Sequence, residues 1–501
     1  MKDQINSLTL LLGNLKMEKE ELNRLLNSEI ESTSQVIEKS IEKLSQKFDG
    51  SEIKSFIKQP YVMLPAGKDQ WYVAVPKIFK WQIGWLEQST DSYNIFRVNK
   101  FMKWLGDIPK EMEHKFKFKE EMPITVDGKI LHTGEALQEK LFERYREFLH
   151  QRKGKDSLTI KPGKEFGLIA KIIDDGTLPF NPIPVENEDL IDNDIIKLRD
   201  YQQEAWKTFL KTGAVGIFWA YSAGKTYFGM KAISCLKGRK LVVVPSITLK
   251  EQWESRLREY GISEYFNVDY ADIDIITYQS FEKIRNEEYV LAIYDECHHL
   301  PANTFSRLST IRAKYRIGLS ATPYREDGRT DYIFALTGFP VGLSWDDLIE
   351  LGVIEKPDVV VYRFGSWQEK ERKLKELLVV DKKTLIFCDS IVTGKRLSKE
   401  LEIPFVYGET KNRTEIIKEN QTVIVSRVGD EGLSIPNLER TIEIDFLFGS
   451  RRQEGQRLGR LFHGENGGGE HFILMTNSEF EDYQKRLYAI SEKGFKIQII
   501  Q

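Results

Sequence analysis

Two short segments of the chain carry residues suited to nucleoside triphosphate chemistry. Residues 220–226 read Ala-Tyr-Ser-Ala-Gly-Lys-Thr, between an apolar run at 215–219 and a helix-like stretch at 227–236. A glycine- and lysine-containing turn between a strand and a helix presents backbone N–H groups and a positive charge to phosphates. Residues 295–298 read Asp-Glu-Cys-His and follow a hydrophobic strand-like run at 289–294. Two carboxylates at a strand end can hold Mg²⁺ and activate a water molecule.

Each segment predicts specific roles for its side chains. Backbone N–H groups of Ser222, Ala223 and Gly224 would wrap the phosphates, Lys225 would add a positive charge, and the Thr226 hydroxyl would bind Mg²⁺. In the second segment Asp295 would hold Mg²⁺ through its water shell, and Glu296 would polarise the attacking water.

Each segment also has a plainer interpretation. Trp219 stands where the strict phosphate-loop pattern has glycine, and Gly-Lys-Thr is common by chance. Two acidic residues after a strand also suit a solvated turn or a helix cap. The loop, the strand, their spacing and His298 agree on triphosphate hydrolysis, and we therefore favour it.

Short β-branched runs alternate with helical stretches over the rest of the chain after residue 197. The strand-like runs lie at 241–244, 273–277, 289–294 and 315–319, and then at 359–362, 384–387, 404–407, 422–425, 441–444 and 472–475. Such alternation is typical of α/β folds with parallel sheets. We expect two tandem doubly wound domains, at about 195–345 and 346–501.

The region before residue 195 differs in composition and in the spacing of its apolar residues. Residues 1–48 place apolar side chains three, four or seven apart, which predicts a helical hairpin or a coiled-coil-like arm. We favour the hairpin because Gly13 and the polar patch 31–35 interrupt the stripe. Residues 49–194 would form an accessory region that contains a small separate aromatic-rich domain. Residues 134–153 look helical and basic, and the passage 179–194 is typical of a linker.

Basic and aromatic residues mix between 71 and 119, and two interpretations stay open. They could stack bases and neutralise phosphates, or they could be a solvated face over an aromatic core.

Bulk properties limit the remaining possibilities. The 501 residues include 73 basic and 76 acidic side chains and carry a net charge of −3, so any nucleic-acid surface must be local. Cys235, Cys297 and Cys388 lie far apart without metal-ligand spacing, which favours a reducing compartment. The sequence contains no signal-like start and no apolar stretch approaching about 18 residues. We expect a soluble, cytoplasmic protein.

The order of the segments from about 197 to 476 resembles superfamily two helicases and translocases, and within them the XPB family. The resemblance rests on segments of characteristic sequence. These are Leu-Arg-Asp-Tyr-Gln at 198–202, Val-Val-Val-Pro-Ser at 242–246, Gln-Trp at 252–253, Ile-Thr-Tyr-Gln-Ser at 276–280, Ser-Ala-Thr at 320–322, Arg-Glu-Asp-Gly at 325–328, and the runs 426–432 and 449–460.

The resemblance implies two RecA-like domains that use ATP and Mg²⁺ and act on single- or double-stranded DNA. It implies nucleotide-contacting roles for further residues, namely Arg199, Tyr201, Gln202, Asp430 and Gln456. Arg457 and Arg460 would reach the triphosphate from the second domain and act in catalysis. Contact with nucleic acid, or coupling to it, is implied for Pro245, Ser246, Thr277, Gln279, Ser320, Thr322, Arg325, Glu326, Asp327, Ser426 and Arg427.

Several departures from the family pattern accompany these matches. His463 stands in place of a third arginine, and Ser434 in place of an aspartate. The stretch 358–382 is too short for the thumb-like insertion of XPB proteins, and the first 190 residues match no domain that we can name.

The sequence therefore predicts an ATP-dependent DNA helicase or double-strand DNA translocase. Three alternatives stay open: an RNA helicase, a motor subunit that works with a separate nuclease or a repair or recombination partner, and an ATP-binding module without turnover.

Overall fold

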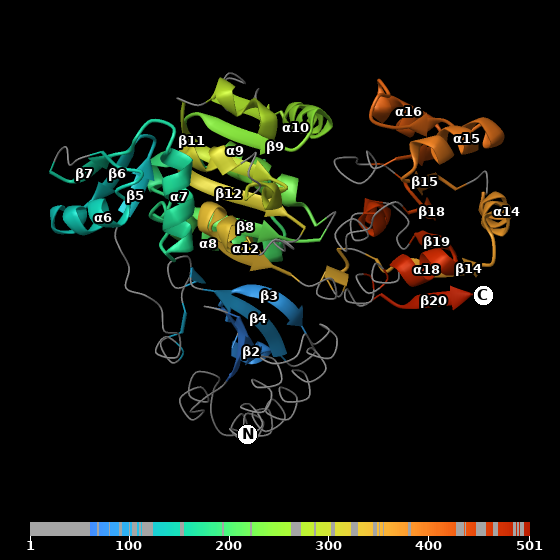
Figure 1. The fold of residues 1–501 in the computed structure, drawn as a ribbon, viewed down its shortest axis with the longest axis horizontal. Helices are drawn as coiled ribbons and strands as arrows, with labels where there is room; N and C mark the ends of the chain where they lie inside the picture. Colours follow the sequence, from blue (N-terminus) through green and yellow to red (C-terminus); the bar gives the residue numbers. More distant parts are fainter. Residues whose placement is uncertain are drawn as a thin grey trace.

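In a computed structural model of the protein, the described residues form four β-sheets (Figure 1). The structure describes residues 61–67, 70–79, 81–89, 93–99, 101–102, 108–109, 112, 124–150, 155–192, 195–220, 223–261, 272–284, 287–301, 306–321, 329–343, 348–349, 351–353, 355–378, 382–426, 435, 437–446, 457–463, 469–483, 487, 490 and 495–500. The helical hairpin predicted for residues 1–48 lies outside these ranges. None of the helices in the described ranges is long and apolar enough to cross a lipid bilayer.

The first α/β domain is built on a six-stranded parallel sheet with the strand order β10-β9-β11-β12-β8-β13. Its strands are β8 (Ala214–Phe218), β9 (Lys240–Val244), β10 (Ile273–Thr277), β11 (Glu288–Asp295), β12 (Arg312–Ser320) and β13 (Phe339–Gly342). Every residue of β8 and β9 is buried, as expected of parallel strands covered on both faces. This confirms the predicted parallel α/β fold.

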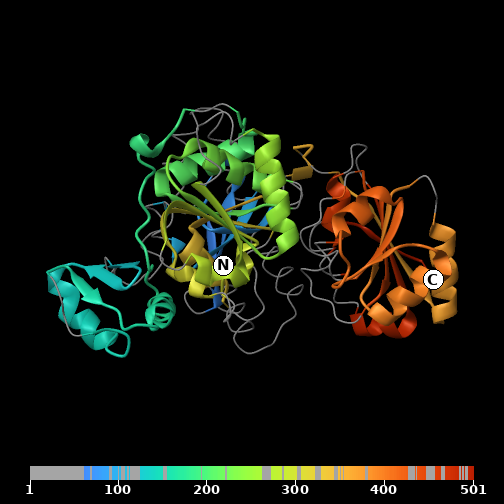
Figure 2. The same ribbon diagram turned by 90° about the horizontal axis from the view of Figure 1, so that it is seen from above.

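Helices lie on both sides of this sheet (Figure 2). The α-helices are α8 (Asp200–Thr212), α9 (Lys225–Cys235), α10 (Ile247–Glu259) and α12 (Thr330–Thr337). Short 3₁₀ turns lie between the strands, namely η5 (Tyr278–Lys283) after β10, and η6 (Cys297–His299) and η7 (Ser306–Thr310) between β11 and β12.

The second α/β domain has a seven-stranded parallel sheet with the order β16-β17-β15-β18-β19-β14-β20. Its strands are β14 (Asp358–Phe364), β15 (Thr384–Cys388), β16 (Phe405–Val406), β17 (Thr422–Val425), β18 (Arg440–Asp445), β19 (Glu470–Thr476) and β20 (Ile497–Ile500). Its helices are α14 (Trp367–Leu377), α15 (Ile391–Leu401), α16 (Arg413–Glu419), η9 (Arg460–His463) and α18 (Asn477–Tyr483). This sheet confirms the second predicted α/β domain.

The aromatic-rich region forms a four-stranded antiparallel sheet with the order β1-β2-β4-β3. Its elements are β1 (Val62–Gly67), β2 (Gln70–Pro76), η1 (Lys77–Phe79), β3 (Trp85–Ser89) and β4 (Tyr93–Asn99). We expected a small separate domain, but Val73 and Phe96 belong to the same hydrophobic core as Ile217 of β8. Trp85 packs edge-on against Phe218, with ring centroids 5.3 Å apart. The aromatic side chains thus bury their surface against the first α/β domain.

A three-stranded sheet, β5-β6-β7, forms the other part of the front region. It comprises β5 (Ile124–Asp127), β6 (Ile130–Thr133), η2 (Glu135–Leu137), α6 (Gln138–Arg144) and β7 (Ser157–Thr159). The helix predicted over 134–153 is therefore shorter. It ends because residues 145–148 turn and Leu149 forms a β-bridge with Ile160, which draws the chain back toward the sheet.

Helix α7 (Glu165–Asp174) joins this three-stranded module to the first α/β domain (Figure 1). Leu168 and Ile172 pack into the core of the module. Ile169 and Ile173 pack into the core of the α/β domain. Residues four apart lie on one face of a helix, so α7 presents one apolar strip to each core.

The passage predicted as a linker, 179–194, lies against the first α/β domain in its described part. Asp189, in η3 (Asn187–Asp189), accepts hydrogen bonds from Lys314 Nζ at 2.8 Å and from the Tyr315 hydroxyl at 2.6 Å. Leu190 forms a β-bridge with Leu236. The connection is therefore a fixed part of the domain surface.

Candidate nucleotide and nucleic-acid site

The predicted phosphate loop connects the end of β8 to the start of α9. Gly224 has a φ of 78°, which is the left-handed conformation that glycine tolerates best. A Cβ at this position would lie 2.5 Å from Gln202 Nε2, so no larger residue fits without a shift. Ala223 is buried, and Thr226 is half-buried in the first turn of α9. Ser222 lies outside the described residues.

Lys225 folds back onto its own loop. Its Nζ donates hydrogen bonds to the carbonyl oxygens of Trp219 at 3.0 Å and Ala220 at 3.1 Å. Burial lowers the pKa of the Lys225 ammonium, and the charges of Glu296 and Asp295 partly oppose this shift. A cation that donates to neutral carbonyl oxygens is well placed to exchange them for charged phosphate oxygens.

The residues implied for adenine contact are tied to the same loop. Gln202 is buried, its Oε1 accepts a hydrogen bond from Arg199 N at 3.0 Å, and its Nε2 donates to the carbonyls of Ala223 and Gly224 at 3.3 and 3.4 Å. The Tyr201 hydroxyl donates to the Ala223 carbonyl at 2.7 Å. Gln202 therefore holds the loop against the start of α8, while Tyr201 and Arg199 are the more exposed members of this group.

Two carboxylates lie at the carboxyl end of β11. Asp295 accepts a hydrogen bond from Trp253 Nε1 at 2.8 Å and one from Glu296 N at 3.0 Å. Burial and the neighbouring charge of Glu296 raise the pKa of Asp295, although the Trp253 bond opposes this. Burial acts to raise the pKa of Glu296 as well, but the hydrogen bond and charge of His298, together with Lys225, lower it.

Trp253 was not among the predicted site residues. It is buried in α10, and its side chain orients the candidate metal ligand Asp295. The available signal was its place in the Gln-Trp pair that resembles a family motif, which says nothing of this bond.

A short polar chain connects Glu296 to the end of β12. His298 Nδ1 lies 3.2 Å from Glu296 Oε2 and 2.9 Å from Ser320 Oγ. Ser320 Oγ is also 3.4 Å from Glu296 Oε2. The predicted coupling residue Ser320 is therefore next to the candidate general base. Thr322, Arg325, Glu326 and Asp327 lie outside the described residues.

The described residues implied for nucleic-acid contact lie after the carboxyl ends of parallel strands. Pro245 and Ser246 follow β9, and the Ser246 hydroxyl accepts a hydrogen bond from Leu249 N at 3.3 Å, which caps α10. Thr277 ends β10, and its hydroxyl lies 3.0 Å from Ser280 Oγ. Gln279 is exposed beside it, Ser426 is buried after β17, and Arg427 lies outside the described residues. Ligands of open α/β sheets bind at this edge.

Arg457 and Arg460 differ in what they contact. Arg457 is fully buried, donates to Glu443 Oε2 at 2.7 Å, and forms a second ion pair with Asp389. The positive charge of Arg460, by contrast, contributes to the lowered pKa of Lys225 in the first domain. Arg457 thus neutralises carboxylates inside its own domain, whereas the charge of Arg460 acts on Lys225. Contact of the two arginines with the triphosphate stays a prediction. Asp430, Ser434 and Gln456 lie outside the described residues, as does the side chain of His463.

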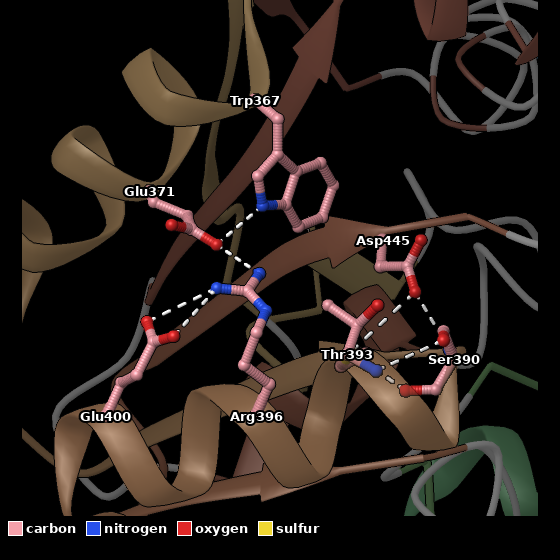
Figure 3. Close-up of polar contacts among 8 residues, drawn as sticks. Trp367, Glu371, Ser390, Thr393, Arg396, Glu400 and Asp445 are labelled. Carbon is pink, nitrogen blue, oxygen red and sulfur yellow. Dashed lines mark hydrogen bonds and ion pairs between the residues drawn. The ribbon is translucent and has the colours of Figure 1, made fainter.

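Helix α15 follows β15, which lies between β17 and β18 in the second sheet. Ser390 N donates to Asp445 Oδ2 at 2.9 Å, and the Ser390 hydroxyl accepts from Thr393 N at 3.2 Å (Figure 3). Arg396 bridges Glu371 of α14 and Glu400 of α15 (Figure 3). These contacts fix the helix that follows β15.

Within the described ranges, no group of three or more His, Cys, Asp or Glu side chains is placed to hold a metal ion. The candidate ligands for Mg²⁺ remain Thr226 and Asp295. Thr226 lies in the first turn of α9, directly after the phosphate loop, and Asp295 ends β11.

Two family models match the chain. Residues 195–325 match the model described as type III restriction enzyme, res subunit. Residues 375–493 match the model described as ERCC3/RAD25/XPB C-terminal helicase. The matches cover the described phosphate loop, the carboxylate pair and both arginines.

Proteins with similar sequences are named as DNA helicases or translocases. A Rad25 protein of Halobacterium salinarum is 31% identical over 351 residues, which are 60% of this chain and 58% of that protein. A "DNA 3'-5' translocase XPB2" of Sulfurisphaera tokodaii is 29% identical over 60% of this chain and 83% of that protein. The chain thus spans a little over half the length of the Halobacterium relative.

Among solved structures, S. cerevisiae Dbp5 bound to RNA and ADP BeF3 has a TM-score of 0.50. It is 13% identical, and the alignment covers 61% of this chain and 90% of the Dbp5 chain. At this identity the likeness concerns the fold, and it agrees with two RecA-like domains.

Proposed function

We infer that this protein is an ATP-dependent DNA helicase or double-strand DNA translocase. The inference rests on the two α/β domains, which resemble those of superfamily two and of XPB proteins. Residues 195–345 would be the ATP-binding motor domain and 346–501 the second motor domain. Residues 1–48 would be a helical arm, and 49–194 an accessory region that guides nucleic acid.

One observation carries this proposal: the phosphate loop precedes α9 and the carboxylate pair ends β11, and the two lie close enough for the carboxylates to act on Lys225. Burial lowers the pKa of Lys225, the charges of Glu296 and Asp295 oppose that shift, and the charge of Arg460 adds to it. The loop turns at Gly224 in the left-handed conformation, and a Cβ there would collide with the Gln202 side chain, so the bend of the loop needs glycine. The side chains present therefore fit Mg-ATP, which would supply the phosphoryl bond whose cleavage drives movement.

The chain's own residues have distinct tasks in this proposal. Lys225 would leave the Trp219 and Ala220 carbonyls and bind phosphate, while Thr226 and Asp295 would hold the ion. Glu296, kept ionised by His298, would orient and deprotonate the attacking water. Arg460 would stabilise charge on the phosphoryl group only when the two domains approach each other, which makes hydrolysis depend on conformation.

Steady-state ATPase assays test the proposal directly. Turnover would be measured alone and with single-stranded DNA, duplex DNA or RNA, for the wild type, Lys225→Ala and Glu296→Gln. The exposed Lys207→Ala and Glu251→Gln are matched controls, because they change the same residue types away from the site. We expect DNA-stimulated turnover that both site variants abolish and both control variants retain.

Other outcomes would favour the alternatives. Stronger stimulation by RNA would favour an RNA helicase, and ATP binding without any turnover would favour a binding module. Strand displacement on forked, blunt and four-way substrates with each tail polarity would then separate unwinding from translocation. Co-purification of a nuclease would support a motor subunit that works with a partner.

A further inference from the structure

Two segments predicted to contact nucleic acid each send one aromatic side chain to the carboxylate pair. Helix α10 begins after Ser246, and its Trp253 Nε1 donates a hydrogen bond to Asp295 Oδ2 at 2.8 Å. The turn η5 begins at Tyr278, whose hydroxyl donates to the Asp295 carbonyl oxygen at 3.0 Å. Both aromatic side chains are buried. The two segments follow different strands of the sheet, β9 and β10, yet they converge on the same residue.

Trp253 joins helix α10 to the end of β11. Trp253 and Leu257 are the buried residues of α10, so they fix how this helix lies on the sheet. The indole also lies against α9, because a Cβ on Gly229 would come within 2.7 Å of Trp253 Cη2. Ser246 caps α10 seven residues before Trp253, which is roughly 10 Å along the helix axis. A displacement of α10 would therefore move the donor that orients the Asp295 carboxylate.

Tyr278 holds the backbone of the carboxylate pair. Its hydroxyl lies 3.4 Å from the Glu296 carbonyl oxygen, in addition to its bond to the Asp295 carbonyl. Glu296 has φ and ψ angles of 48° and 50°, a left-handed conformation that is unfavourable for residues other than glycine. Such a conformation persists only where the surrounding contacts stabilise it. The Tyr278 hydroxyl supplies one such contact, so the direction of the Glu296 side chain depends on it.

The neighbours of Tyr278 in the sequence are residues implied for nucleic-acid contact. Thr277 is half-buried and Gln279 is exposed, so both can meet a sugar-phosphate backbone while the ring between them stays in the core. Close-packed protein interiors transmit displacements. A shift of this turn on contact with nucleic acid would therefore change the position of the Tyr278 hydroxyl relative to the carboxylate pair.

We propose that Trp253 and Tyr278 are positioning residues that couple nucleic-acid contact to ATP hydrolysis. Trp253 acts through the carboxylate of Asp295, and Tyr278 acts through the backbone of Asp295 and Glu296. The proposal rests on the proposed function above, and it goes further by assigning the link between the two sites to two buried side chains. Because coupling between two binding sites is reciprocal, nucleotide should change the affinity for DNA by the same factor as DNA changes the affinity for nucleotide.

The test uses two variants that delete the polar atom and keep an aromatic ring, Trp253→Phe and Tyr278→Phe. The matched controls are Trp206→Phe and Tyr315→Phe, which make the same changes in the same hydrophobic core. Trp206 packs between α8 and α9, edge-on to a phenylalanine of α9. Tyr315 is buried in β12, and its hydroxyl donates to Asp189 at 2.6 Å. The controls therefore report on general loosening of the core.

Two quantities would be measured for each protein. The affinity for fluorescently labelled single-stranded and duplex DNA would be measured by anisotropy, with and without Mg²⁺ and a non-hydrolysable ATP analogue. The ratio of the affinities with and without the analogue is the coupling factor. The ratio of DNA-stimulated to basal turnover is the stimulation ratio, and melting temperatures show that each variant is folded.

We expect the wild type to have a coupling factor that differs from one. Tyr278→Phe should lower the stimulation ratio about three- to tenfold, the factor for one lost hydrogen bond between neutral groups. Trp253→Phe should lower it about tenfold or more, because its bond to a carboxylate is stronger. In both variants the coupling factor should move toward one, while the affinity for DNA without nucleotide changes little. Both controls should keep the coupling factor and the stimulation ratio of the wild type.

Several results would overturn the proposal. These are a wild type that binds both ligands with a coupling factor of one, unchanged coupling factors in both variants, and equal losses in the controls. An unchanged factor in one variant would remove that side chain from the link. Failure of the wild type to bind any nucleotide or any nucleic acid would instead refute the proposed function. If one variant does not fold, the coupling factor of the other still decides whether a buried aromatic side chain forms the link.

Discussion

Arg457 and Arg460 lie three positions apart, and the structure predicts opposite consequences for the same substitution at the two sites. Arg457→Gln would leave Glu443 and Asp389 without their cation, and both carboxylates have side chains with 0% exposure. Breaking a buried ion pair by removing one partner costs about 3–5 kcal/mol. For a domain of roughly 150 residues this corresponds to a fall in melting temperature of about 6–20 °C.

Arg460→Gln should act on chemistry instead. Loss of an arginine that stabilises the transferring phosphoryl group lowers turnover by about 10³-fold or more. We expect this variant to melt closer to the wild type than Arg457→Gln does, while losing nucleic-acid-stimulated ATPase activity. The pair is matched, because both substitutions remove one buried guanidinium from the same segment.

Calorimetry and hydrogen exchange would separate the two effects. Calorimetry gives the melting temperature, and exchange in β15 and β18 reports on the strands that carry or adjoin the two carboxylates. The reasoning would be refuted if Arg457→Gln melted within about 2 °C of the wild type yet lost as much turnover as Arg460→Gln, since two buried carboxylates that lose their shared cation should destabilise the domain.

Three further substitutions test other parts of the structure. Ser320→Ala should lower the ratio of DNA-stimulated to basal turnover by about five- to tenfold, the factor for one lost hydrogen bond, and an unchanged ratio would remove Ser320 from the coupling path. Burial lowers the pKa of Lys240 from its usual value of 10.5 to about 8. As the pH falls from 10.5 toward 8, the lysine becomes charged in the unfolded chain before it does in the folded protein, and the free energy of unfolding therefore decreases. Lys240→Met should lack that slope in urea unfolding and be more stable at pH 7 by on the order of 2 kcal/mol. Gly213→Ala should destabilise by about 2 kcal/mol or more, because φ is 62° and the Cβ would lie 2.2 Å from the Ile183 carbonyl oxygen, whereas Gly408→Ala, with open space, should melt like the wild type.

The strands of both sheets could be predicted because burial on both faces leaves a direct trace in the sequence. Residues 240–244 read Lys-Leu-Val-Val-Val, and the whole of this strand is buried. The predicted runs agree with observed strands to within a few residues, but the edge strands β13 and β20 were not predicted. Periodicity does not, however, show which surfaces meet. The aromatic residues before position 105 therefore suggested an independent domain, although they share a core with the first sheet.

The site could be predicted as a set of residues but not as a set of contacts. The pattern that includes Gln202 says nothing of its bonds to the carbonyls of Ala223 and Gly224, which depend on the left-handed turn at Gly224. Likewise, Arg457 and Arg460 look alike in the sequence. The carboxylates that distinguish them, Glu443 and Asp389, are 14 and 68 positions from Arg457, and only the folded sheet brings them together.

Helix α7, with one apolar strip in each of two cores, bears on how this protein can be dissected. A fragment that starts at residue 195 would contain the whole nucleotide site but lose Ile169, Ile173 and the aromatic sheet that cover its core. The freshly exposed apolar surface would favour aggregation during expression. The front region is therefore inseparable from the motor as a unit of folding. Swapping it for the front of another motor would require repacking the shared core as well as joining the chains.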